Sequence, residues 1–148
     1  MITTHYLYPG AIFTHQKPYE VSTILGSCVS VCLWDSYLEI GGINHFMLPF
    51  WNGDGLASPK YGNIATEKLL DKMLALGSST KNLSAKVFGG AKQLETGSFF
   101  NVGERNVSLA LEFLKEQHIS IISQNTGGER GRKLIFRTHS GEVFMKFV

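Results

Sequence analysis

Hydrophobic positions fall into short strand-like runs and two longer stretches with helical spacing. Apolar residues recur every three or four positions over residues 64–76 and 103–117, which predicts two amphipathic helices. Asn63 is the expected N-cap of the first helix, and Gly77 ends it. Runs rich in β-branched and aromatic residues, separated by glycine, proline and polar residues, predict strands. These expected strands cover residues 11–14, 20–25, 28–34, 40–48, 83–88, 119–123, 134–138 and 143–148.

This mixture of strands with two helices predicts an α/β or α+β fold, built as one layered domain over residues 1–148. The chain shows no internal repeat, linker or low-complexity tract. Its 148 residues, 43% hydrophobic and 18% charged, are enough to bury a core without disulfides or metals. The polar, glycine-rich segment 50–62 predicts a long loop that follows the strand over 40–48.

The stretch from Val21 to Pro49 carries the candidate chemistry. If residues 35–38 connect two antiparallel strands, the expected opposed pairs are Trp34 with Glu39, Cys32 with Gly41, Ser30 with Ile43 and Cys28 with His45. Opposed residues share a face, with Cβ atoms about 4.5–5.5 Å apart. A thiol and an imidazole so placed are suited to act as nucleophile and base. A slip of one residue would separate them, so the prediction depends on the turn.

The residues alone leave two interpretations of Cys28 and His45 open, a structural role and a catalytic one. A single cysteine in an apolar run is usually a core residue, and a single histidine is usually structural. Gly26 and Ser27 favour catalysis, because small side chains before Cys28 let backbone N–H groups approach a substrate oxygen. Ser22 and Thr23 bring hydroxyl groups beside Cys28, although both residue types also suit a strand.

Composition excludes several other classes of function. The formal net charge is only +2, without a cluster of basic residues on a helix or strand, so we expect no nucleic-acid partner. The N-terminus lacks the pattern of a signal peptide and no apolar run approaches ~20 residues, so we expect a cytoplasmic protein without membrane insertion. On a regular strand Cys28 and Cys32 lie about 13 Å apart, too far for a disulfide. The same separation argues against a zinc site with His45, so we expect no metal or cofactor.

Several motifs resemble those of the CheD family, the chemoreceptor glutamine deamidases of bacterial and archaeal chemotaxis. The principal ones are TILGSCVSVCLWD at 23–35 and GGINHFMLP at 41–49. The likeness continues through KVFGGA at 86–91, GERN at 103–106, GG at 127–128 and GRK at 131–133. These motifs occur in the family's order and span nearly the whole chain, which makes the likeness more specific than any single motif.

The resemblance implies helices packed outside stacked β-sheets and a cysteine-dependent deamidation of glutamine through a thioester. In this scheme Cys28 is the nucleophile and His45 the base, with oxyanion donors in the backbone around Gly26 and Ser27. A hydroxyl residue upstream of the cysteine positions the histidine. Ser22 occupies that place by count and Thr23 is adjacent, so the third residue stays open.

The resemblance also implies partners, namely the cytoplasmic helices of methyl-accepting chemoreceptors and a CheC-type phosphatase. Without a sustained heptad pattern, a monomer is the simplest expectation. Two alternatives remain: a different cysteine hydrolase that uses the same pair, and a non-catalytic adaptor that binds a receptor or phosphatase.

Overall fold

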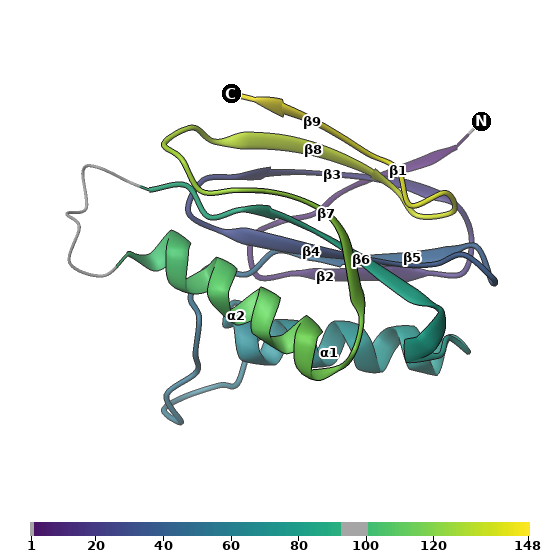
Figure 1. The fold of residues 1–148 in the computed structure, drawn as a ribbon, viewed down its shortest axis with the longest axis horizontal. Helices are drawn as coiled ribbons and strands as arrows, with labels where there is room; N and C mark the ends of the chain where they lie inside the picture. Colours follow the sequence, from purple (N-terminus) through teal and green to yellow (C-terminus); the bar gives the residue numbers. More distant parts are fainter. Residues whose placement is uncertain (1, 93–100) are drawn as a thin grey trace.

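Two stacked β-sheets and a pair of helices form three layers in the computed structural model, which describes residues 2–92 and 101–148 (Figure 1). The four-stranded sheet has the order β1-β3-β8-β9 and comprises β1 (Thr3–Tyr6), β3 (Tyr19–Leu25), β8 (Arg132–Arg137) and β9 (Val143–Phe147). The five-stranded sheet has the order β2-β5-β4-β6-β7 and comprises β2 (Ile12–His15), β5 (Ile40–Asn44), β4 (Val29–Asp35), β6 (Leu83–Gly89) and β7 (Ser120–Thr126).

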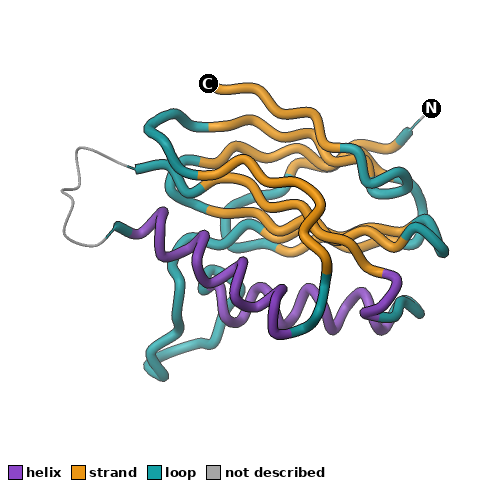
Figure 2. The backbone as a smooth tube through the Cα atoms, viewed as in Figure 1, coloured by secondary structure: helices purple, strands orange, loops and turns teal. Residues whose placement is uncertain are grey.

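Both helices, α1 (Gly62–Ala75) and α2 (Val102–Glu116), pack against the outer face of the five-stranded sheet (Figures 1 and 2). A short 3-10 helix, η1 (Thr80–Asn82), leads into β6. The predicted α+β class with helices outside stacked sheets is therefore confirmed. Strand β1 was not predicted, because all four of its residues are exposed and give no alternating pattern.

Strand β4 lies at the centre of the molecule and is covered on both faces. Its odd-numbered residues face the helices, while Cys32 faces the four-stranded sheet. This explains why β4 has a nearly continuous apolar sequence instead of a strict alternation. The core between the two sheets consists of Leu7, Val21, Leu25, Cys32, Ile43, Phe88, Leu134 and Phe136.

Glycine at position 42 lets α1 approach β5 closely. A Cβ atom added to Gly42 would lie 2.6 Å from the Cγ2 atom of Thr14 and 2.9 Å from a methyl carbon of Leu69. Any larger side chain would therefore push the helix layer away from the strand that leads into His45.

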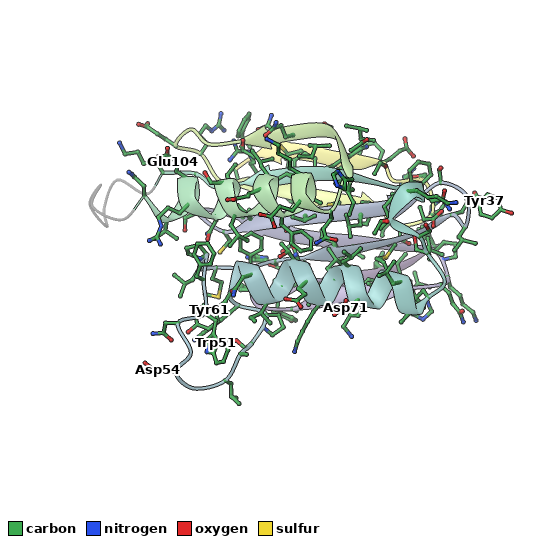
Figure 3. The ribbon with its side chains drawn as sticks, turned by 60° about the horizontal axis from the view of Figure 1, so that its bottom comes forward. Tyr37, Trp51, Asp54, Tyr61, Asp71 and Glu104 are labelled. Atoms are coloured by element: carbon green, nitrogen blue, oxygen red, sulfur yellow. The ribbon has the colours of Figure 1, made fainter. Side chains whose placement is uncertain are left out.

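The expected N-cap of α1 was wrong. The helix begins two residues earlier than expected, at Gly62, with Tyr61 as N-cap residue. The side-chain oxygen of Asn63 instead accepts the backbone N–H of Trp51 at 3.0 Å, so it fixes the predicted loop before the helix. Figure 3 labels Trp51 and Asp54 on this loop, where the Trp51 indole N–H donates to the Asp54 carbonyl.

The predicted register between β4 and β5 was also wrong, by two residues. Asp35 pairs with Ile40 and Cys32 pairs with Ile43, instead of Trp34 with Glu39 and Cys32 with Gly41. The reason lies in Asp35, whose Oδ1 atom accepts the N–H groups of Tyr37 and Leu38 and so starts the turn one residue later than expected.

Candidate active site

The two-residue register shift between β4 and β5 changes which residues lie opposite each other, but each side chain stays on the sheet face that was predicted for it. Val29 forms a bridge with Phe46, so His45 falls opposite Ser30 and not opposite Cys28. A shift of two residues leaves the strand parity unchanged, because side chains alternate with a period of two. Cys28 packs against the core between the sheets, the same layer in which His45 lies beside Thr23.

Thr23 connects the two sheets through His45. Its Oγ1 atom lies 2.7 Å from His45 Nδ1 and donates to the Leu7 carbonyl oxygen at 2.8 Å. Because the single hydroxyl proton is used on Leu7, the oxygen must accept from an N–H at Nδ1. This bond assigns the tautomer and leaves the lone pair on Nε2. The Nε2 atom is buried and has no hydrogen-bond partner within the described residues.

Ser22 is not brought to His45. The side chains of Val21, Thr23 and Leu25 are fully buried between the sheets, whereas Ser22 is only partly buried and Ile24 is 49% exposed. Ser22 therefore belongs to the outer face of β3, since successive side chains of a strand point to opposite faces. Of the two hydroxyl residues that the sequence left open, only Thr23 contacts the imidazole.

Burial sets the resting protonation of the cysteine and the histidine. Burial lowers the pKa of His45 to about 4, and no carboxylate of the described residues opposes this effect. Burial also raises the pKa of the Cys28 thiol above its usual value, an effect that its own backbone N–H partly offsets. Both shifts favour the uncharged forms, so at rest the site holds a thiol and a neutral imidazole instead of a thiolate–imidazolium pair.

Cys28 opens onto a cavity of about 780 Å³, a size typical of ligand pockets. The described residues that line it come from five parts of the chain: Ser27, Cys28, Met47, Leu48, Gly90, Lys92, Asn101, Val102, Gly103, Glu104, Val107, Ser108, Thr126, Gly127, Gly128 and Glu129. Glu104, labelled in Figure 3, lies on the first turn of α2. His45 is not among these residues, so a ligand in the cavity meets the sulfur first.

The turn before Cys28 is fixed through its carbonyl groups. The carbonyl oxygens of Gly26 and Cys28 accept the backbone N–H groups of Ala91 and Gly90, both at 2.9 Å. A side chain at Gly89 would collide with the Cys28 carbonyl oxygen, and its φ of +110° also requires glycine. Among the described residues, no carbonyl accepts the N–H of Ser27 or Cys28. These two groups are free to bind a substrate oxygen.

Arg132 supports the cavity-lining loop at Gly127 through a buried side chain. The side chain is only 2% exposed and donates to Asn125 Oδ1 at 2.8 Å and to the carbonyl oxygens of Gly127 and Gly89 at 2.7 and 3.3 Å. Burial lowers the pKa of this guanidinium. Arg132 thus joins the ends of β6 and β7 to the loop that follows β7.

Sequence reasoning missed three polar residues of this region. Arg132 belongs to a basic, glycine-rich segment typical of an exposed turn. The Oδ1 atom of Asn44 accepts a hydrogen bond from the Val31 N–H, in place of the backbone bond that a regular ladder would form. Asn106 reaches the turn before Cys28 from α2. Two signals in the sequence pointed to them: each lies at or inside an apolar segment, where a polar residue needs partners, and each belongs to one of the motifs that resemble the CheD family.

Within residues 2–92 and 101–148, no three histidine, cysteine, aspartate or glutamate side chains lie close enough to share a metal ion. The helices of that part of the chain are too short or too polar to span a bilayer.

Comparison with known proteins identifies the family. A family model described as CheD chemotactic sensory transduction matches residues 47–147. The chain belongs to the CheD family. Related CheD proteins, each named a probable chemoreceptor glutamine deamidase, occur in Trichlorobacter lovleyi, Sulfurimonas denitrificans and Rhodospirillum rubrum.

These relatives align along almost the whole chain. The Trichlorobacter lovleyi protein is 50% identical over 145 residues, which is 97% of this chain and 90% of the relative. The Sulfurimonas denitrificans protein is 46% identical, with 97% and 93% covered. The Rhodospirillum rubrum protein is 42% identical, with 97% and 81% covered. The alignments to these CheD proteins therefore extend well beyond the segment that the family model matches.

The protonation state of this CheD site can be tested by the pH dependence of thiol alkylation. With a raised Cys28 pKa, the thiolate fraction grows about tenfold per pH unit, so the iodoacetamide rate should rise steadily from about pH 6 to pH 9. The His45→Ala variant should keep this profile, because a neutral imidazole does not stabilise the thiolate. Cys32 is 2% exposed and should not react in the folded protein. A rate that is level around neutral pH in wild type, and lost in His45→Ala, would instead reveal an ion pair.

Proposed function

We propose that this chain is a chemoreceptor glutamine deamidase that uses Cys28 as nucleophile, His45 as general base and acid, and Thr23 as the residue that positions His45. The carrying observation is the bond between Thr23 and His45 Nδ1, which directs the basic lone pair to Nε2. The names of the related CheD proteins support the reaction, and the opening of Cys28 onto the cavity supports the choice of nucleophile.

The reaction begins from the neutral pair. As Sγ of Cys28 attacks the carboxamide carbon of a glutamine, its proton moves to Nε2 of His45, and the carbonyl oxygen becomes an oxyanion. His45, now an imidazolium hydrogen-bonded to Thr23, then protonates the amide nitrogen. Ammonia leaves and a thioester remains on Cys28. A water molecule loses a proton to Nε2 and attacks the thioester, which releases glutamate and restores the thiol.

The oxyanion forms on the cavity side of the sulfur. The N–H groups of Ser27 and Cys28 support an oxyanion hole there, because both are without a carbonyl acceptor among the described residues. The predicted donor group included Gly26. Gly26 is not among the described residues that line the cavity, and its carbonyl oxygen accepts the N–H of Ala91, so we assign Gly26 the role of fixing the turn.

The substrate in this proposal is the cytoplasmic helical region of a methyl-accepting chemoreceptor, and the protein acts in the cytoplasm as a monomer. A CheC-type phosphatase remains a proposed partner. The apolar side chains at the cavity mouth, among them Met47 and Leu48, each 40% exposed, suit a protein substrate whose glutamine projects from a helix.

The decisive experiment incubates a chemoreceptor cytoplasmic fragment with wild type or Cys28→Ala and follows it by intact and peptide-level mass spectrometry. We expect a gain of about one dalton per modified glutamine with wild type only, since each amide nitrogen is replaced by oxygen through the Cys28 thioester. Modification by Cys28→Ala would disprove the mechanism. Equal receptor binding without modification by either protein would favour the adaptor.

The third residue is tested by a matched pair on β3. Thr23→Val removes the hydroxyl but keeps the shape, and should lower kcat about 100-fold because the imidazole loses its orientation and its stabilised charge. Thr23→Ser keeps the hydroxyl and should lose less than about tenfold. Ser22→Ala, on the outer face, should match wild type. The reverse ranking, with Ser22→Ala inactive and Thr23→Val active, would assign the role to Ser22.

A further inference from the structure

The antiparallel ladder between β4 and its partner opens directly beside the nucleophile. Val29 and Phe46 exchange two backbone hydrogen bonds, at 3.1 and 3.0 Å. In a regular ladder the next bonded pair lies two residues further on, which here would be Ser27 with Leu48. Leu48 is instead bound elsewhere: its N–H donates to Lys60 and its carbonyl oxygen accepts from Gly62. Ser27 thus loses the partner that would have used its N–H.

The side chain of Asn106 occupies this opening. It reaches in from α2 and is fully buried. Its Nδ2 atom donates to the carbonyl oxygen of Ser27 and to that of Met47, both at 3.1 Å. These two acceptors lie on the two diverging segments, so a single amide group spans the gap between them.

The orientation of the Asn106 amide follows from its surroundings. Exchanging oxygen and nitrogen would place the oxygen against two carbonyl oxygens, which cannot donate to it. In the orientation seen, Oδ1 is buried without a partner within the described residues. A buried acceptor without a donor reduces stability, a loss that the two bonds from Nδ2 must offset.

We propose that Asn106 is a positioning residue that holds the two segments at a fixed separation and fixes the turn before Cys28, so that the N–H groups of Ser27 and Cys28 stay where they stabilise the oxyanion formed at Cys28. Ser27 and Cys28 both line the cavity, and the Cys28 N–H lies beside its own sulfur, where the oxyanion forms. Without the Nδ2 donor, the bridge between the carbonyl groups of Ser27 and Met47 is lost, so the peptide group that joins Ser27 to Cys28 can rotate and move its N–H away from the oxyanion. This inference rests on the proposed deamidation.

The test compares deamidation with alkylation in Asn106→Asp and Asn106→Leu. Both replacements are close to asparagine in size and remove the double donor. When the Cys28 sulfur attacks iodoacetamide, it displaces iodide at a saturated carbon and no oxyanion forms. Deamidation forms an oxyanion in two steps, when the thioester is made and when it is hydrolysed. We therefore expect kcat on a chemoreceptor fragment to fall at least about tenfold, with KM and the alkylation rate within about threefold of wild type.

Thr66→Val is the matched control. Thr66 is also buried in a helix and donates to a carbonyl oxygen, that of Gly62 at 2.8 Å, and among the described residues it forms no side-chain hydrogen bond to the turn before Cys28. Its loss should lower the melting temperature but leave kcat unchanged. If the Asn106 variants keep the wild-type kcat, or if deamidation and alkylation fall by the same factor, the inference is overturned. Deamidation by Cys28→Ala, measured in parallel, would overturn the proposed function separately.

A measurement on wild type keeps the inference testable if the variants do not fold. Amide hydrogen exchange should be fast at Ser27 and slow at Val29, whose N–H is bound to Phe46. Protection of Ser27 equal to that of Val29 would show that its N–H already has a partner, and would overturn the inference.

Discussion

The hydrogen bond between Thr23 and His45 is the interaction on which the site depends. Thr23 belongs to the four-stranded sheet, while His45 follows β5 of the five-stranded sheet, so the bond forms only when the two sheets stack in register. The core between the sheets surrounds it and excludes water. This packing explains how a site made of few polar groups obtains a single histidine tautomer. The Thr23 hydroxyl donates its proton to the Leu7 carbonyl oxygen, so it can only accept from the imidazole.

The same burial that fixes His45 also removes charge from it. Many cysteine hydrolases are described with a thiolate already paired to an imidazolium. In this chain the raised pKa of Cys28 and the lowered pKa of His45 favour a neutral pair instead. Charge then develops only during attack, so oxyanion donors and the Thr23 bond contribute most where the transition state needs them. A neutral resting thiol is also less open to oxidation.

Much of this arrangement could be predicted from the sequence, and the errors have identifiable physical causes. The apolar run of β4 and the two helical patterns gave the layers, because each element has one consistent pattern. The register failed because the Asp35 side chain starts the turn one residue later, a local hydrogen bond that periodicity does not show. The shift was even, so the expected common face of Cys28 and His45 was unaffected. Thr23 could not be chosen over Ser22 until the buried face of β3 was known. The role of Asn106 could not be predicted either, because the residues that it contacts lie about 60 to 80 positions away in the sequence.

In the proposed mechanism His45 rests as a neutral imidazole with its proton on Nδ1, held by Thr23. The most direct measurement is the ¹⁵N spectrum of the His45 ring in the wild-type protein around neutral pH, assigned by comparison with His45→Ala. The structure predicts a protonated Nδ1 and an unprotonated Nε2. It also predicts that Thr23→Val weakens this preference. An imidazolium at neutral pH, or a neutral ring with its proton on Nε2, would contradict the account.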